Sequence, residues 1–251
     1  MSYSSAVSYV KLSPNCYRGR SFNGEQRKID TVTIHHTAGV PSVEALGADF
    51  ANRGRRASSN YGVGNDGRIA CYVEEENTAW TSSSRDNDSR AITIEVVNSK
   101  AGEPWPVSDA AYAALCGLLV DVCKRNGIKR LLWKNDKGLV GQPEKQNMTI
   151  HRWFSATACP GTYLYERMGD IAARVNEKLE EWEDDNVKRY NTMEEISQDA
   201  PWAVETVKKL IEVGVLKGYG KKDAQGRPAD LDLSYDMLRM LSMNDQMGVY
   251  G

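Results

Sequence analysis

The stretch Thr31-Val32-Thr33-Ile34-His35-His36-Thr37 decides the fold class of this chain. Most of its residues are β-branched, and the residues Ala38-Gly39 that follow it are typical of a turn. A short apolar run bounded by turn residues predicts a buried strand. The strand ends on His35 and His36, two of only three histidines in the 251 residues. An imidazole at the end of a buried strand is the first candidate for chemistry.

Helical and strand patterns alternate around this strand. We expect a helix over 41–53, a hairpin around Asn65-Asp66-Gly67, a strand over 91–97, a helix over 108–126, a polar loop over 134–149 and a helix over 163–182. The helix over 108–126 is apolar on nearly every side, so we expect it to be central and buried. Strands mixed with helices predict an α/β domain whose central sheet is covered by helices.

The pattern breaks at Glu183-Asp184-Asp185-Asn186. Residues 183–251 hold 13 acidic and 9 basic residues, whereas residues 1–182 hold 21 and 23. This change of sign supports a domain boundary. We expect a domain over 1–182, a linker over 183–192 and a small helical domain over 193–251. Four methionines near the end of the small domain form either its core or an adaptable contact surface, because methionine repacks easily; they are Met237, Met240, Met243 and Met247.

The composition excludes several classes of function. Lys and Arg number 32 and Asp and Glu 34, so the basic excess of a nucleic-acid-binding protein is missing. The longest apolar run, between Asp109 and Asp121, is shorter than the ~20 residues of a membrane span. The first residues lack a basic region followed by an apolar one, so we expect cytoplasmic synthesis without a signal peptide. Five cysteines cannot all pair, and we expect a reducing compartment.

The third histidine opens a second candidate segment, HRWFSATACPG, which runs from His151 to Gly161 and contains Cys159. Zinc binds imidazole and thiolate, and catalytic sites keep three protein ligands. Two histidines and a cysteine on two segments are compatible with such a site. The spacing by itself leaves a buried His–Cys pair without metal as the alternative.

Four segments occur in the order typical of one family: TVTIHHTAG, SSNYGVGNDGRI, AITIEVVNS and HRWFSATACPG. Over residues 11–180 the chain resembles the zinc-dependent type-2 N-acetylmuramoyl-L-alanine amidases, a superfamily that includes phage endolysins and peptidoglycan recognition proteins. The resemblance implies a central mixed β-sheet flanked by helices. It also implies peptidoglycan as substrate, with hydrolysis of the amide bond between N-acetylmuramic acid and L-alanine.

The resemblance carries over to individual residues. It implies that His35, His151 and Cys159 bind Zn²⁺. His36 falls on the neighbouring position, where the family varies; we expect it to support a ligand or to pack, and direct ligation is the alternative. In one branch of the family a glutamate at the position of Glu95 is the general base. Thr157 matches a position near the scissile carbonyl oxygen, where a hydroxyl stabilises the oxyanion; a loop-stabilising threonine is the alternative.

A second branch of the family uses a catalytic tyrosine, whose position falls on Ser59 in this chain. Tyr61 lies two residues later, on a position that is usually aromatic and packed, so we expect it in the core. Several further residues are candidates for binding carboxylates and sugar faces in a groove. These are Arg55, Arg56, Trp80, Arg90, Arg152 and Trp153.

The segment DAPWAVETVKKLIEVGVLKGYG, residues 199–220, resembles the first half of an S-layer-homology repeat. The chain departs from that repeat at Leu233-Ser234-Tyr235-Asp236. The resemblance implies binding to a secondary cell-wall polymer, and a homodimer through the Met-bearing helix is the alternative. We expect a phage endolysin that acts on the bacterial wall after release. A non-catalytic peptidoglycan-binding module and a cytoplasmic muropeptide-recycling amidase are the alternatives; the three filled ligand positions favour the enzyme.

Overall fold

The computed structural model describes residues 3–186 and 188–250, with residues 182–186 described by their backbone alone. The chain divides into two compact units, Met1–Glu180 and Glu181–Gly251. Among the described residues, no helix has the length and apolar character that crossing a membrane requires.

The first unit is built on a six-stranded mixed sheet with the strand order β1-β7-β6-β9-β5-β10. Its strands are β1 (Val7–Val10), β5 (Thr31–His36), β6 (Tyr61–Val63), β7 (Ile69–Cys71), β9 (Ala91–Val96) and β10 (Met148–Ile150). Only β6 and β7 pair antiparallel, across the predicted turn; every other neighbouring pair is parallel. The predicted α/β class is confirmed. Two small two-stranded sheets complete the unit: β2 (Cys16–Tyr17) with β8 (Thr78–Ala79), and β3 (Ser21–Phe22) with β4 (Glu25–Gln26).

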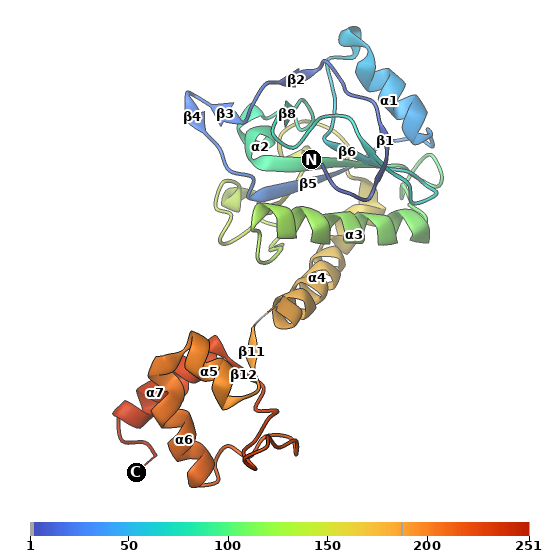
Figure 1. The fold of residues 1–251 in the computed structure, drawn as a ribbon. Helices are drawn as coiled ribbons and strands as arrows, with labels where there is room; N and C mark the ends of the chain where they lie inside the picture. Colours follow the sequence, from blue (N-terminus) through green and yellow to red (C-terminus); the bar gives the residue numbers. More distant parts are fainter. Residues whose placement is uncertain (1–2, 187, 251) are drawn as a thin grey trace. The chain divides into compact units, whose positions relative to one another are not determined.

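Helices cover both faces of this sheet (Figure 1). On one face lie α3 (Asp109–Asn126) and the first part of α4 (Gly161–Asn186), and on the other lie α1 (Val43–Ala51) and α2 (Arg85–Arg90). Short 3-10 turns connect these elements: η1 (Arg53–Arg55), η2 (Lys137–Leu139) and η3 (His151–Trp153). The predicted helix starts are confirmed by their caps, since the hydroxyls of Ser42 and Ser108 accept backbone N–H groups of α1 and α3.

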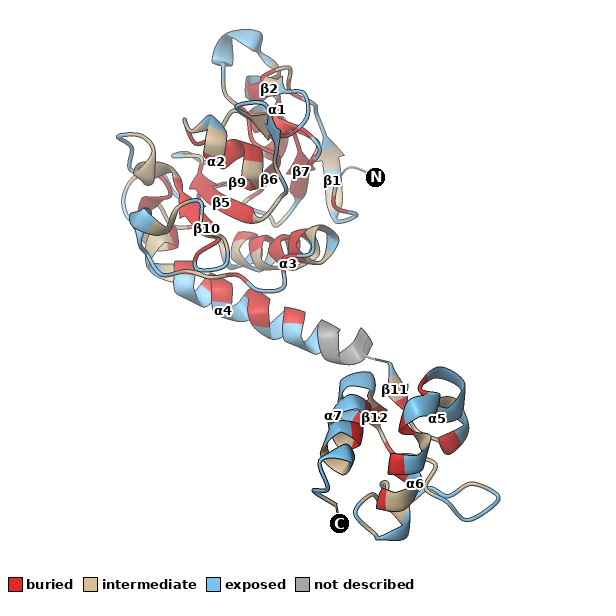
Figure 2. Cartoon of the chain, turned by 90° about the vertical axis from the view of Figure 1, so that its left-hand side faces the viewer, coloured by how far each residue is buried: buried red, intermediate tan, exposed pale blue. Residues whose placement is uncertain are grey.

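The main core lies between the sheet and the helices α3 and α4. Alternate strand residues point into it, and buried residues form a stripe along each helix (Figure 2). The strands contribute Val32, Ile34, Ile92, Ile94, Val96, Met148 and Ile150. The prediction that α3 is buried on nearly every side is wrong. Ala113 and Gly117 face solvent, because small apolar side chains add little to the core and are tolerated at a surface.

Two parts of the sheet were absent from the sequence prediction. We expect a loop over 134–149, but its last two residues belong to β10, which pairs in parallel with β5. The N-terminal strand β1 adds the opposite edge by pairing with β7. Both strands are short edge strands of three and four residues, so neither contains enough alternation to be detected.

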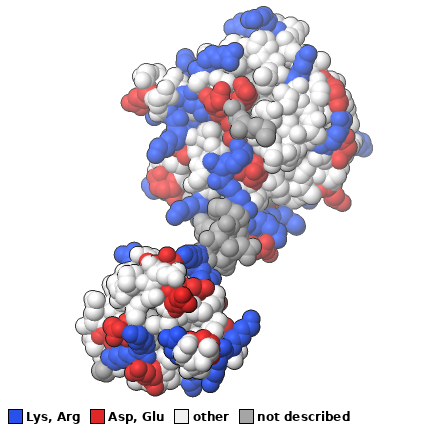
Figure 3. All heavy atoms as spheres, in the orientation of Figure 1, with Lys and Arg blue, Asp and Glu red and all other residues white. Residues whose placement is uncertain are grey.

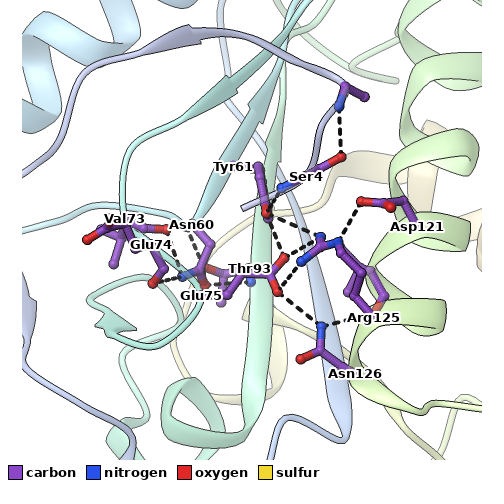
Figure 4. Close-up of polar contacts among 12 residues, drawn as sticks. Ser4, Asn60, Tyr61, Val73, Glu74, Glu75, Thr93, Asp121, Arg125 and Asn126 are labelled. Carbon is purple, nitrogen blue, oxygen red and sulfur yellow. Dashed lines mark hydrogen bonds and ion pairs between the residues drawn. The ribbon is translucent and has the colours of Figure 1, made fainter. Parts of the chain in front are cut away.

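A polar network ties the end of α3 to the sheet (Figure 4). The hydroxyl of Tyr61 donates to the carboxylate of Glu75 (2.6 Å) and accepts the backbone N–H of Ser4 (2.9 Å). Arg125 from α3 forms two hydrogen bonds of 2.7 Å to the same carboxylate. Tyr61 is fully buried, so its expected place in the core is confirmed.

The second unit has a core of its own. Its elements are β11 (Arg189–Tyr190), α5 (Met193–Asp199), η4 (Pro201–Ala203), α6 (Val204–Glu212), β12 (Leu233–Ser234) and α7 (Tyr235–Gln246). Because α4 continues to Asn186 and β11 pairs with β12, most of the described part of the expected linker 183–192 is regular structure. Glutamate favours helix, and nothing before residue 187 breaks α4.

Three methionines of α7 and Met247, which follows its last residue, are at the surface. Met240, Met243 and Met247 are 61%, 59% and 68% exposed, and Met237 is 39% exposed. The interpretation of these residues as a core is therefore wrong. Leu238 and Ser242, one helical turn apart, are the buried residues of α7, and the methionines occupy other faces of the helix.

Candidate metal centre and active-site cleft

Parallel pairing places two candidate residues side by side. His35 lies near the end of β5, and its register partner on β9 is Glu95. Both side chains point to the sheet face opposite α3, since residues two apart in a strand share a face. On the other side of β5, Ile150 is in register with Ile34, so His151 follows directly beside His35. The ends of β9, β5 and β10 therefore lie side by side.

The loop after η3 brings Cys159 to the same strand ends. Its Sγ lies 3.4 Å from Nδ1 of His35, and the rings of His35 and His151 have centroids 5.0 Å apart. One donor atom from each of the three residues lies within 4.8 Å of the others. Zn–S and Zn–N bonds of about 2.3 and 2.0–2.1 Å at a tetrahedral angle give an N···S separation of about 3.6 Å. The three side chains fit a tetrahedral metal site.

The protonation of these groups follows from their burial. His35 is fully buried, and desolvation lowers its pKa well below the ordinary value, with a smaller effect from His151. Burial also lowers the pKa of His151 and raises that of Cys159. Neutral imidazoles are ready to bind a metal, whereas the thiol gives up its proton on binding. Nε2 of His35 is buried without a hydrogen-bond partner among the described residues.

Glu95 has a desolvated setting that suits a proton carrier. Its Oε2 is buried and without a hydrogen-bond partner in the described part of the chain. Burial raises the pKa of Glu95 to about 8, and the charge of Arg55 acts in the opposite direction. A carboxyl group with a pKa near neutrality can both take up and release a proton.

Thr157 is exposed in the loop between His151 and Cys159. Its Oγ1 accepts the backbone N–H of Cys159 at 3.2 Å, which leaves the hydroxyl hydrogen free to donate. The same loop is held by Arg152, which donates to the carbonyls of Ala158 (2.6 Å) and Cys159 (3.2 Å). Arg152 therefore holds in place the loop that carries Cys159, and it does not line a groove.

His36 has a structural environment. Its Nδ1 lies 3.2 Å from Oδ1 of Asn98, and its ring meets that of Trp105 edge-on with centroids 5.0 Å apart. Asn98 also donates to the carbonyl of Trp105 at 2.8 Å. These contacts fasten the segment after β9 to the strand end.

A polar layer lies beneath the metal centre. The hydroxyls of Thr33 and Thr149, each two residues before a histidine, are 2.8 Å apart. Asn87 of α2 donates to Thr33 and accepts from Thr149, both at 3.0 Å. Asp88 accepts the backbone N–H groups of Thr81 and Ser82, and burial raises its pKa. The layer connects the strand ends to the loop that precedes α2.

The centre opens into a cleft of about 830 Å³ that extends between α1, η1 and α2. Its lining includes Glu95, His151, Thr157 and Cys159. Of the groove candidates, Arg55, Arg56 and Trp80 line the cleft.

Three groove candidates are occupied elsewhere, so their assignment to the groove is wrong. Arg90 pairs with Asp30 at 2.7 Å, and Trp153 stacks on Trp133 with centroids 5.2 Å apart. Arg152 binds the loop that carries Cys159, as described above. Arg90 and Trp153 are held by residues distant in sequence, and Arg152 is held by carbonyls of its own loop. The local sequence predicts neither kind of contact.

Sequence reasoning missed two residues of the cleft wall, Tyr17 and Arg85. The guanidinium of Arg85 stacks over the ring of Tyr17 at 4.1 Å, and Tyr17 packs against Trp80 with centroids 5.2 Å apart. No motif marks them, because they come from β2 and the start of α2, which are distant in sequence and meet only in the folded chain.

Three convergent ligands beside a carboxylate, open to a cleft, are the arrangement of a metal-dependent hydrolase. The sequence comparison then gives the family. The family model described as N-acetylmuramoyl-L-alanine amidase matches residues 25–162, more than half of the chain, and the chain belongs to this family.

Solved structures of similar proteins have low sequence identity to the chain. PlyL is 18% identical, with a TM-score of 0.47, and the match covers 66% of this chain and 95% of PlyL. AmpD is 19% identical, with a TM-score of 0.48 and coverages of 68% and 97%. The N-acetylmuramoyl-L-alanine amidase LysC from Clostridium intestinale is 15% identical, with a TM-score of 0.42 and coverages of 68% and 99%. No curated protein matches the chain in sequence.

Proposed function

We propose that the chain is a zinc-dependent amidase that cleaves the bond between N-acetylmuramic acid and L-alanine in peptidoglycan. Membership of the amidase family supports the reaction. The observation that supports metal binding is the convergence of His35, His151 and Cys159 beside a cleft. Thiolate among the ligands favours Zn²⁺ over hard cations such as Mg²⁺ or Ca²⁺.

The chain's own residues supply the proton transfers. Bound Zn²⁺ supplies Lewis acidity, which polarises the scissile carbonyl and makes a water molecule a better nucleophile. Glu95 accepts the proton of the attacking water and delivers it to the leaving amine. The hydroxyl of Thr157, free to donate, stabilises the negative charge that develops on the carbonyl oxygen.

The experiment that tests this function is mass spectrometry of purified peptidoglycan after incubation with the zinc-loaded protein. We expect stem peptides with a free N-terminal L-alanine, and none in the presence of a zinc chelator. The matched control is Glu95→Gln, which keeps all three ligands and should release far less peptide than the wild type. A folded, zinc-loaded protein that releases nothing from several wall types would instead support the non-catalytic binding module.

We also propose that the protein acts as a phage endolysin and that the second unit binds a secondary cell-wall polymer. The support is a separate compact unit with its own core and two exposed aromatic residues, Trp202 (45%) and Tyr219 (81%). The test is co-sedimentation of the full chain with purified walls, compared with Tyr219→Ala. Undiminished binding by the variant, together with a dimer in light scattering, would favour dimerisation through the methionines of α7.

A further inference from the structure

The cleft beside the metal centre carries positive charge that the protein itself does not neutralise. Three of its lining residues are arginines: Arg55, Arg56 and Arg85. Arg55 is paired, because its Nε lies 2.7 Å from the carboxylate of Asp49. Among the side chains that the structure describes, those of residues 3–181 and 188–250, neither Arg56 nor Arg85 forms an ion pair. Two guanidinium groups in the cleft therefore remain available to a ligand.

The remaining acidic residues of the cleft cannot take the place of a partner. Asp88 is 4% exposed, and both its carboxylate oxygens already accept backbone N–H groups of the loop before α2. Glu95 lies beside the proposed metal ligand His35 and is assigned to proton transfer. The charge at Arg56 and Arg85 is therefore not balanced from within the lining.

Contacts place the guanidinium of Arg85, and the position after η1 places the backbone of Arg56. Arg85 is the first residue of α2, and its stacking over Tyr17, which itself packs against Trp80, gives the exposed side chain a defined position. Arg56 ends η1 with a left-handed backbone (φ 52°), directly after the paired Arg55. Pre-positioned donors lose less side-chain entropy when they bind a ligand.

The charges on one face of the first unit show no general preference for anions. On the face shown in Figure 3, acidic and basic side chains are interspersed over the first unit. Selectivity for a negatively charged ligand must therefore arise locally, where these two arginines lie.

We propose that Arg56 and Arg85 make the enzyme selective for stem peptides whose carboxyl groups are free, over stem peptides in which they are amidated. The inference rests on the proposed amidase function. A guanidinium binds a carboxylate through two parallel, charge-assisted hydrogen bonds. A primary amide offers one acceptor and turns an N–H donor toward the other guanidinium donor, which leaves groups unpaired.

The test uses two synthetic N-acetylmuramoyl peptides that share the scissile bond and differ only in free or amidated stem carboxyl groups. The zinc-loaded full-length protein should cleave the free-acid peptide with a kcat/KM about tenfold higher or more, mainly through a lower KM. The double variant Arg56→Gln with Arg85→Gln should lose this preference and cleave both peptides with about equal kcat/KM.

The matched control is Arg53→Gln, because Arg53 lies on the same turn η1 but does not line the cleft. It should keep the wild-type preference. A second readout is calorimetric binding of both peptides to Glu95→Gln, which should show the same preference without turnover.

The outcomes separate the two proposals. Equal kcat/KM for the two peptides in the wild type, or a preference that survives in the double variant, would overturn the role of the arginines. Failure of the wild type to cleave either peptide would count against the proposed function itself.

Discussion

The two faces of the central sheet are made by the same strands, yet they carry different kinds of residue. One face is apolar and packs in the main core, through Val32, Ile34, Ile92, Ile94, Val96, Met148 and Ile150 of β5, β9 and β10. On the other face Thr33 belongs to the polar layer, His35 is one of the candidate metal ligands, and Glu95 lines the cleft. The period of two in a strand separates packing from chemistry. Replacements on one face should change stability, and replacements on the other should change activity.

The largest effect is expected at the metal ligands. Cys159→Ser replaces the thiolate by a weak ligand, so we expect loss of bound zinc and a fall in peptide release on the order of 10³-fold or more. Metal analysis and the peptidoglycan digest measure both. Cys116→Ala is the control, because this cysteine lies on α3, on the other side of the sheet. Full activity of the Cys159 variant would remove Cys159 from the ligand set.

Glu95→Gln tests the chemistry of the polar face without removing the metal. The amide cannot accept the proton of the attacking water, so we expect turnover to fall by about 10²- to 10⁴-fold while zinc content stays near that of the wild type. Turnover of a muramoyl peptide and metal analysis on the same preparation provide the measurement. Wild-type turnover in this variant would exclude Glu95 as the general base.

Leu118→Ala tests the opposite face. Leu118 of α3 is fully buried in the main core, and its truncation should lower the free energy of unfolding by about 2–5 kcal/mol. The kcat of the folded fraction should remain close to that of the wild type. Denaturant unfolding and turnover at low denaturant are the two measurements, and Leu12→Ala, at a residue 50% exposed, is the control. A large fall in kcat with unchanged stability would contradict the separation of the faces.

Asn87→Ala is expected to have the smallest effect. It should change both stability and activity, because Asn87 supports the polar layer beneath the histidines. The change leaves the hydroxyls of Thr33 and Thr149 without their shared amide partner, at a cost of about 1–3 kcal/mol in the free energy of unfolding. Because the layer lies beneath the histidines, we expect a moderate fall in kcat as well. Thermal unfolding and kinetics on the same sample test this. A variant with lower stability and unchanged kcat would show that the layer supports the fold alone.

Local patterns predicted much of the architecture. The β-branched run at 31–37, the turn at Asn65-Asp66-Gly67 and the capping serines correspond to β5, the β6–β7 hairpin and the starts of α1 and α3. The strands β1 and β10 were not detected, because each is short and finds its place only by pairing with a strand that is distant in sequence. The methionines of α7 show the same limit, since helical spacing does not tell which face of a helix the core covers.

The sequence by itself determined which residue types are present for chemistry: a strand that ends in histidine, a segment with histidine and cysteine, and a glutamate within an apolar strand. These are local properties, because periodicity and motif order are written along the chain. Only the tertiary structure decided that His35, Glu95 and His151 lie at neighbouring strand ends, since this depends on parallel register between strands. It also decided which arginines are neutralised and which remain open in the cleft. Charge pairing depends on distances between residues far apart in sequence, and those distances exist only after folding.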